Sequence, residues 1–318
     1  MTKKKKLLIL ILIAVTIIFD ALVLALGTNM SAKEKTVLVV LFDISALALI
    51  LFKDVLFGMA GIVLHDKRLI LNLSKNDFKT RYAGSYFGII WAFIQPIIML
   101  LVYWFALDIG LRAGKTMEHP FILWLMAGLV PWFYFAEALG TGTNALMEYS
   151  YLVKKVVFKI DILPIVKVTS AIFIHLFFVT FIIIFQCFYG YYPDLYTIQV
   201  IYYIICMYAF ILGLTYFTSA AVIFFRDLNQ IISIILQVGI WATPIMWNIQ
   251  DLMPKLDKVM KLNPVYYVVS GFRDSLLVKK WFWERPVWSM IFWTTIILLY
   301  VFGYKVFQKL KVHFADVL

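Results

Sequence analysis

The sequence predicts an all-α polytopic membrane protein. Of its 318 residues, 64% are hydrophobic and 15% are charged, whereas soluble domains are about half apolar and about a quarter charged. The apolar residues fall in blocks of about twenty, the length at which a helix crosses a ~30 Å hydrocarbon core, and they lack the alternation of a lipid-facing barrel. The longest stretch between candidate spans, Asn248 to Pro286, is too short for a soluble catalytic domain. Any nucleotide chemistry must therefore come from another chain.

An N-terminal two-span hairpin is expected over residues 1–65. It consists of two apolar runs and a short connecting loop: Leu7–Gly27, Val37–Phe52 and Thr28–Thr36. The block Lys3–Lys6 precedes the first run and should stay in the cytoplasm. A cleaved signal peptide is the alternative, since Ala25 and Gly27 offer small residues before a cut. The length of the first run, and the second run that follows at once, favour the hairpin.

Six further spans are expected in a core formed by residues 85–318. They are Tyr86–Leu107, Phe121–Leu139, Leu163–Phe188, Ile198–Phe225, Ile231–Trp247 and Val287–Phe307. This arrangement places 18 of the 29 Lys and Arg on the side of the N-terminus, and 7 of the other 11 lie in the single segment 248–286. Because cytoplasmic loops collect Lys and Arg, both termini are predicted to be cytoplasmic. The net charge of +11 is therefore a topology signal, and no nucleic-acid partner is expected without a clustered basic face.

An interfacial amphipathic helix is expected just before the core, over residues 66–84. Its apolar residues can share one helical side opposite its basic residues: Leu69, Leu73 and Phe78 against Lys75, Lys79 and Arg81. Such a helix lies in the headgroup region of the membrane. A solvated linker whose charges only set the topology is the alternative.

The inner loop 148–161 is the second informative cytoplasmic segment. Its sequence, EYSYLVKKVVFKID, is compatible with an amphipathic helix that ends before Pro164. We expect it to present a contact surface to a cytoplasmic partner. The surface consists of Glu148, Tyr151, Lys154, Lys155 and Phe158.

Several motifs resemble, in order and spacing, the membrane subunit of ABC exporters for polysaccharides and teichoic acids. They are KNDFKTRYAGSYFGIIWAFIQP (Lys75–Pro96), VPWFYF (Val130–Phe135), YLVKKVVFKIDILP (Tyr151–Pro164), FFRDLNQI (Phe224–Ile231), WATPIMW (Trp241–Trp247), LNPVYYVVSGFRD (Leu262–Asp274) and KLKVHFADVL (Lys309–Leu318). The resemblance covers about residues 69–318. That family has a six-span core, so the hairpin is an addition that the resemblance does not explain.

The resemblance implies a homodimer of this permease with two copies of a separate ABC ATPase subunit. The complex would export a polymer carried on an undecaprenyl-type pyrophosphate lipid across the cytoplasmic membrane. ATP and Mg would be bound by the ATPase, with no cofactor in this chain, and the loop 148–161 would be the coupling helix. The one near match to a phosphate-binding loop, GLRAGKT at Gly110–Thr116, has one residue too few between its glycines and lies in a predicted outer loop.

Basic residues near the inner interface are candidates for two roles. Lys79 and Arg81 can hold the lipid pyrophosphate, because cationic side chains near headgroups recognise phosphate; topogenic anchoring is the alternative. Arg226 and Asp227 stand where a span meets the cytoplasm. They are interpreted either as a buried pair that biases a gate, or as a snorkelling Arg and a helix N-cap.

Aromatic residues are candidates for a sugar path, because flat rings cover the C–H faces of pyranoses. The set is Tyr82, Tyr86, Trp91, Trp104 and Trp241. Aromatic belts at the membrane interfaces are the competing explanation. Ionisable residues inside predicted spans are costly and indicate function or pairing; Asp20, Asp43, Glu137 and His175 are in such positions.

The outer segment 248–286 mixes basic residues with Trp281, Phe282 and Trp283. We expect short helices that dip into the outer interface, an outer gate in the family, where the basic charge meets either an anionic polymer or lipid headgroups. The alternatives from other classes are a polyprenyl-lipid glycosyltransferase or phosphatase, and a drug or lipid exporter. The enzyme would need carboxylates, His or Arg clustered at one membrane face, whereas the four histidines are scattered. The outer segment and the Lys75–Pro96 motif favour a polymer.

Overall fold

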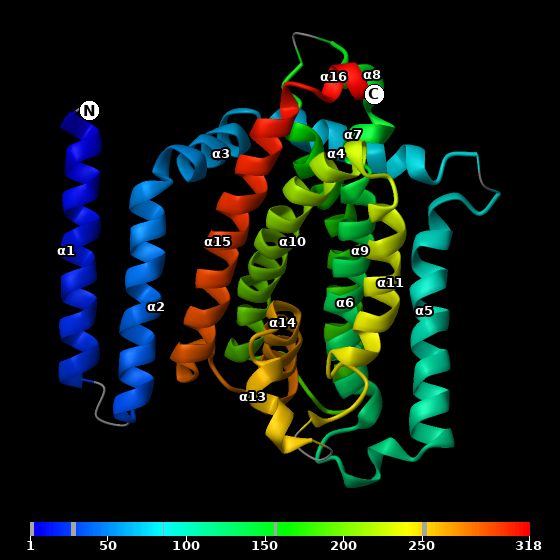
Figure 1. Ribbon diagram of the computed structural model, residues 1–318. Coiled ribbons are helices and arrows are strands. Elements are labelled where there is room, and N and C mark those ends of the chain that lie inside the picture. The colour runs from blue at the N-terminus through cyan, green and yellow to red at the C-terminus, as the bar shows by residue number, and fades with distance from the viewer. Residues whose placement is uncertain (1–2, 27–29, 85, 156–157, 250–252) are drawn as a thin grey trace.

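The chain folds into an all-helical assembly, seen in a computed structural model that describes residues 3–26, 30–84, 86–155, 158–249 and 253–318 (Figure 1). Within these ranges there is no strand. Five of the described helical segments are long and apolar enough to cross a membrane: Gly88–Gly110, Phe121–Thr143, Ile162–Cys187, Leu195–Phe224 and Pro286–Lys311. The prediction of an all-α polytopic membrane protein is thereby confirmed. Small parts of three predicted segments, residues 27–29, 156–157 and 250–252, lie outside the described residues.

The two N-terminal helices form an antiparallel hairpin at one edge of the assembly, α1 (Lys3–Leu26) and α2 (Ala32–Leu51) (Figure 1). A capping box starts α2, because Ser31 and Glu34 exchange side-chain and backbone hydrogen bonds. The hairpin attaches to the rest of the chain through α2, where the hydroxyls of Ser45 and Thr294 lie 2.8 Å apart. That both helices cross the membrane stays a prediction.

Helices α3 (Lys53–His65) and α4 (Lys67–Arg81) lie across one end of the assembly (Figure 1). The predicted helix before the core is thus present as α4, but its buried stripe is Ile70, Ser74 and Asp77 rather than an apolar face. On the predicted apolar side, Leu73 and Phe78 are half-buried and pack against the core, and Leu69 is 41% exposed. That this side lies in the headgroup region of the membrane stays a prediction.

Four long helices make the core of the bundle: α6 (Phe121–Thr143), α9 (Ile162–Cys187), α10 (Gln199–Phe224) and α15 (Pro286–Lys311). Small residues let these helices approach closely, as is common inside membranes. A Cβ at Gly303 of α15 would lie 2.5 Å from the carbonyl oxygen of Gly213 on α10. A Cβ at Gly142 of α6 would lie 2.6 Å from the Thr215 methyl group of α10.

Two helices stand at the edge opposite the hairpin, α5 (Trp91–Trp104) and α11 (Leu228–Ala242) (Figure 1). The span that contains α5 runs from Gly88 to Gly110, and only 11% of its most apolar 18-residue stretch is buried. Helix α11 has 15 residues, fewer than the ~20 of a full span. The predicted span Ile231–Trp247 is wrong at its C-terminal end, because α11 ends at Ala242, before Thr243 and Pro244.

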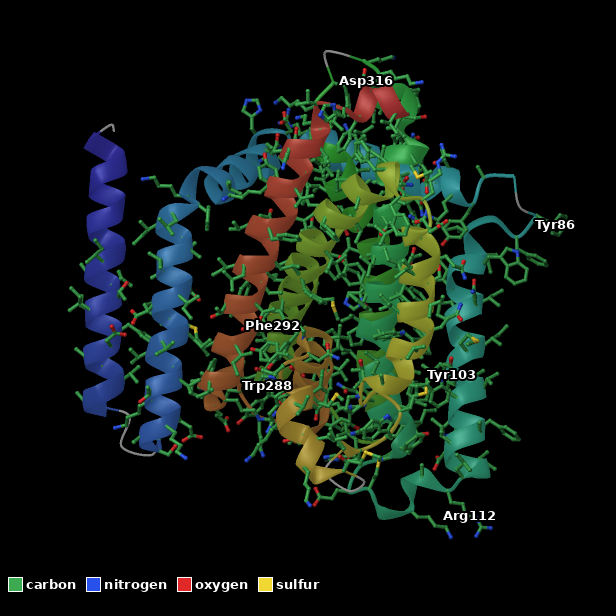
Figure 2. All side chains as sticks on the ribbon, in the orientation of Figure 1. Tyr86, Tyr103, Arg112, Trp288, Phe292 and Asp316 are labelled. Carbon is green, nitrogen blue, oxygen red and sulfur yellow. The ribbon has the colours of Figure 1, made fainter. Side chains whose placement is uncertain are left out.

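Short elements close the two ends of the bundle. They are η1 (Gly88–Ile90), η2 (Phe105–Gly110), η3 (Ala113–Thr116), α7 (Ala145–Glu148), α8 (Ser150–Val153), η4 (Leu195–Ile198), η5 (Pro254–Leu256), α13 (Asp257–Met260), α14 (Pro264–Arg273), η6 (Asp274–Val278), η7 (Phe282–Glu284) and α16 (Phe314–Val317). We call the end that carries α4, α8 and α16 the inner face and the opposite end the outer face (Figure 1). The assignment of the inner face to the cytoplasm stays a prediction. The near match to a phosphate-binding loop lies on the outer face, where Figure 2 labels Arg112.

Candidate functional site

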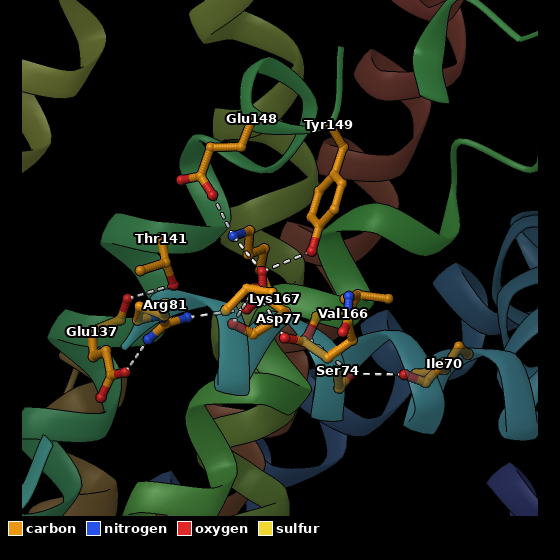
Figure 3. A network of polar contacts seen from close by, with 12 residues as sticks. Ile70, Ser74, Asp77, Arg81, Glu137, Thr141, Glu148, Tyr149, Val166 and Lys167 are labelled. Carbon is orange, nitrogen blue, oxygen red and sulfur yellow. Dashed lines mark hydrogen bonds and ion pairs between the residues drawn. The ribbon is translucent and has the colours of Figure 1, made fainter. Parts of the chain in front are cut away.

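A buried network of charged side chains lies on the inner face, where α4 crosses α9 (Figure 3). The Lys167 ammonium of α9 is 2.6 Å from Asp77 Oδ1 of α4, and each side chain is 5% exposed. The Tyr149 hydroxyl donates to the same carboxylate oxygen at 2.8 Å. Lys167 also forms a close ion pair with Glu148, the last residue of α7. The network therefore joins α4, α9 and the start of the loop 148–161.

Asp77 is charged at the centre of this network. Burial acts to raise the pKa of its carboxyl group, but the hydrogen bond and positive charge of Lys167 outweigh burial and hold the pKa below its ordinary value. Neither Asp77 nor Lys167 is among the functional candidates that the sequence predicts. The available signal was Lys167 itself, a charged residue near the start of an apolar span.

Arg81 extends the network from α4 to α6. Its guanidinium lies 3.2 Å from Asp77 Oδ2 and forms a close ion pair with Glu137. This partner explains the ionisable Glu137 within a span. A pyrophosphate at Arg81 would compete with two carboxylates, whereas Lys79 is exposed and has no ion pair among the residues that the structure describes.

The inner loop 148–161 contains one short helix within its described residues, which exclude 156–157. Helix α8 covers only Ser150–Val153, and α9 begins at Ile162. The loop is held at its C-terminal end by Asp161. The Asp161 side chain pairs with Lys311 of α15, and its backbone carbonyl oxygen accepts a hydrogen bond from the Tyr216 hydroxyl at 2.8 Å. Lys159 pairs with Asp66 at 2.8 Å, between α3 and α4.

The predicted contact residues of this loop differ in the exposure of their side chains. Tyr151 is 58% exposed, and Lys154 and Lys155 are also exposed. Phe158 is half-buried and packs against the core. Tyr151 is therefore the side chain of this set that is best placed to enter a partner's pocket.

The predicted gate pair is not found as a buried ion pair. Arg226 and Asp227 are both exposed, and neither has an ion-pair partner in the described ranges. Asp227 occupies the N-cap position of α11 but makes no side-chain capping bond. These positions agree better with the alternative, a snorkelling Arg and a residue at a helix N-cap, than with a buried gate pair.

The predicted path aromatics divide between the two faces. Tyr82, Tyr86 and Trp91 lie toward the inner face, and Tyr86 is 98% exposed (Figure 2). Trp104 and Trp241 lie toward the outer ends of α5 and α11. Sequence analysis missed Tyr103, whose ring meets that of Trp241 edge-on at 6.2 Å. Helices α5 and α11 thus share one surface with exposed rings.

The remaining ionisable residues of the predicted spans do not gather at one place. His175 is 2% exposed and stacks on Tyr134 with ring centroids 4.6 Å apart, so it belongs to the core. Asp20 is half-buried and Asp43 is exposed on the hairpin. In the described ranges, no three His, Cys, Asp or Glu side chains are grouped to hold a metal ion.

Comparison with known proteins identifies the bundle. The family model of the ABC-2 type transporter matches residues 68–277, from α4 to η6. This chain belongs to the ABC-2 type transporter family. The match begins after the hairpin, so the network of Asp77, Lys167 and Arg81 lies within the ABC-2 region and the hairpin lies outside it.

The ABC-2 region also has curated relatives. The chain is 24% identical over 250 residues to the O-antigen export system permease protein RfbA of Myxococcus xanthus, covering 78% of this chain and 94% of that protein. It is 27% identical over 252 residues to the protein of the same name from Klebsiella pneumoniae, covering 79% of this chain and 95% of that protein. The relatives are thus matched over nearly their whole length, while about a fifth of this ABC-2 transporter chain has no counterpart in them.

Proposed function

We propose that this chain is the membrane subunit of an ABC exporter that carries a polysaccharide across the cytoplasmic membrane. The ABC-2 family and the permeases named for O-antigen export support a transport subunit rather than an enzyme. ATP hydrolysis belongs to a separate ABC ATPase, of which two copies join two copies of this chain. The substrate is a polymer on an undecaprenyl-type lipid, with teichoic acid within the same class.

The observation that carries the proposal is the position of Tyr151. It stands 58% exposed on α8, two residues after Tyr149, and both Tyr149 and Glu148 bind the buried pair of Asp77 and Lys167. A partner that binds Tyr151 therefore contacts a segment that is bonded to both α4 and α9, and a movement of the partner would be transmitted to these helices. The exposed Lys154 and Lys155 add charge at the rim of the same contact.

The polymer path is proposed at the surface of α5 and α11. Both helices expose apolar side chains along their length, including Val102 on α5 and Val238 on α11. A second copy of the chain would cover this surface and enclose the aromatic residues at its two ends, such as Trp91 and Trp241. Lys79, exposed near the inner end, is proposed to meet the lipid pyrophosphate.

The coupling role is tested by co-purification of the ATPase with permease variants. Tyr151→Ala should release or uncouple the ATPase, because truncation of an interface aromatic typically costs ~2 kcal/mol or more. Phe158→Ala tests whether the half-buried ring of Phe158 also contributes to ATPase binding. Lys154→Ala is the control for a charge at the rim of the contact and should weaken ATPase binding only slightly.

Export of the lipid-linked polymer is measured beside co-purification, and membrane insertion of each variant is checked. The expected result is lost ATPase binding and lost export for Tyr151→Ala, with a permease that is still inserted. If Tyr151→Ala and Phe158→Ala retain the ATPase stoichiometrically and export normally, the loop is not the coupling element and α4 becomes the better candidate.

A further inference from the structure

A polar pocket opens on the outer face, at the opposite end of the bundle from the inner network. It has a volume of about 430 Å³, within the range of about 300–1,000 Å³ typical of small-ligand sites. Its walls come from the start of α6, the turn after α11, and the segment of α14 and η6. These elements belong to the outer region that includes residues 248–286.

Three basic side chains line the pocket, against two acidic ones. The bases are Arg273, Lys280 and Arg285, and the acids are Glu118 and Asp274. Arg285 is paired with Asp274 at 2.8 Å. Lys280 is exposed, and no carboxylate pairs with it within the described part of the chain. The lining therefore carries a net positive charge.

Arg273 is the most enclosed of these cations. It is 7% exposed and has no carboxylate partner among the described residues. Its guanidinium lies 3.4 Å from the centre of the Trp124 ring, and donates to the carbonyl oxygens of Pro244 at 2.9 Å and Ile245 at 2.6 Å. These contacts hold the cation rigidly, while no carboxylate oxygen lies within ion-pair distance of it among the described residues, which is costly in a buried place.

The uncharged part of the lining suits a sugar ring. Trp124, Trp247 and Tyr266 supply aromatic surface, and Ser270 supplies a hydroxyl group. Pockets that combine apolar rings with a few fixed polar groups bind small polar molecules in one orientation. With fixed cations added, the best-matched ligand is a sugar unit that carries a carboxylate or a phosphate.

We propose that this pocket is an outer subsite that binds an anionic sugar unit of the exported polymer. The assignment rests on the proposed export function and adds to it the charge class of the substrate. Arg273 forms the fixed base of the subsite, and Lys280 stands free at its rim. Capture of an emerging unit here would oppose its return into the membrane.

The test uses the complete complex of permease and ATPase in nanodiscs of zwitterionic lipid. Binding is measured by calorimetry with three soluble probes: an acidic tetrasaccharide that contains glucuronate, a neutral tetrasaccharide, and glycerophosphoglycerol as the headgroup of an anionic lipid. Lys280→Gln removes the rim charge without breaking a described ion pair. Lys258→Gln is the matched control, since Lys258 is an exposed lysine of the same outer region that does not line the pocket.

The acidic tetrasaccharide should bind the wild-type complex and the Lys258→Gln control equally. Lys280→Gln should weaken binding about two- to fivefold, the range for a single exposed charge, and Lys280→Glu should weaken it further. Equal binding of the neutral tetrasaccharide would overturn the anionic class. Preferential binding of glycerophosphoglycerol would make the pocket a lipid headgroup site and overturn the subsite.

ATP-driven export by the wild-type complex is measured in parallel in polymer-loaded vesicles. The subsite is refuted if all probes bind the Lys280→Gln and Lys258→Gln variants alike. If the wild-type complex exports polymer in that case, the export function still holds. Absence of export by the wild-type complex refutes the export function on its own.

Discussion

Lys167 of α9 and Asp77 of α4 form an ion pair of 2.6 Å in which each side chain is only 5% exposed. These residues lie 90 positions apart in the sequence, so the pair is a long-range bond between α4 and a core helix. It is also the point to which the start of the inner loop is attached through Glu148.

Loss of one member of this pair should destabilise the protein strongly. Lys167→Met leaves the Asp77 carboxylate buried with fewer compensating groups, and breaking a buried pair in this way costs about 3–5 kcal/mol. Replacing both residues, with Asp77→Asn added to Lys167→Met, should recover part of the loss. Unfolding in detergent solution measures each variant. Glu148→Gln is the control, since the Glu148 side chain is 50% exposed, and an equally large loss in that variant would contradict the central role of the buried pair.

Two glycines of α6 should respond in opposite ways to alanine. A Cβ at Gly142 would lie 2.6 Å from Thr215 of α10, whereas nothing lies within 4 Å of a Cβ at Gly140. Gly142→Ala should therefore destabilise the protein by about 1–3 kcal/mol through overpacking. Gly140→Ala should be neutral or stabilise it by up to about 1 kcal/mol through helix propensity. The same unfolding assay compares them, and a harmless Gly142→Ala would show that α6 and α10 can separate at low cost.

The orientation of the chain is open to a direct test with two exposed lysines at opposite ends. Lys115 follows Arg112 on the outer face, and Lys155 follows α8 on the inner face. In a variant lacking Cys187, Lys115→Cys should react with an impermeant maleimide added to intact cells, and Lys155→Cys should react only in inverted vesicles. The reverse pattern of labelling would invert the proposed topology.

Binding of an acidic sugar at the outer pocket should weaken as pH rises through about 6. Burial raises the pKa of Asp274 to about 6, despite the nearby charges of Arg285, Lys280 and Arg273. Below that pH the carboxyl group is neutral and Arg285 is released, while above it the carboxylate repels an anion and occupies Arg285. Glu284 and Tyr203 also face this region, and Glu118 and His119 line the pocket.

The pH effect is isolated by comparison of two variants over pH 5–8. Asp274→Asn should flatten the pH dependence of acidic tetrasaccharide binding, whereas His119→Gln, a change in another side chain that lines the pocket, should keep most of it. Retention of the full dependence in Asp274→Asn would assign the effect to another group.

The sequence was sufficient to predict the long helices and the family, because each depends on local patterns. Apolar blocks such as Phe121–Leu139 specify a helix wherever they pack. The pattern was less informative for α11, whose apolar run continues to Trp247 although the backbone turns at Thr243 and Pro244. Periodicity also cannot state what a helix packs against. It placed Leu69, Leu73 and Phe78 on one side of α4, but it could not show that the contact with α9 buries Asp77.

The charged sites were the least predictable part, since their partners are distant in sequence. Arg81 and Glu137 lie 56 positions apart, and each was interpreted separately, one as a phosphate ligand and the other as an unexplained ionisable group. Only the crossing of α4 over α6 and α9 shows that they neutralise each other. By contrast, the exposure of Tyr151 follows from its place in a polar inner loop.

Helix α5 stands apart from the bundle, since only 11% of the most apolar 18-residue stretch of its span is buried. Within a single subunit this helix gains little from its neighbours, so most of its packing energy must come from whatever covers it after synthesis. A newly made, unassembled subunit would then present a span that gains little support from the rest of its own chain. The cellular amount of this permease should consequently follow the supply of its assembly partners, and an excess of the chain would be degraded rather than accumulate.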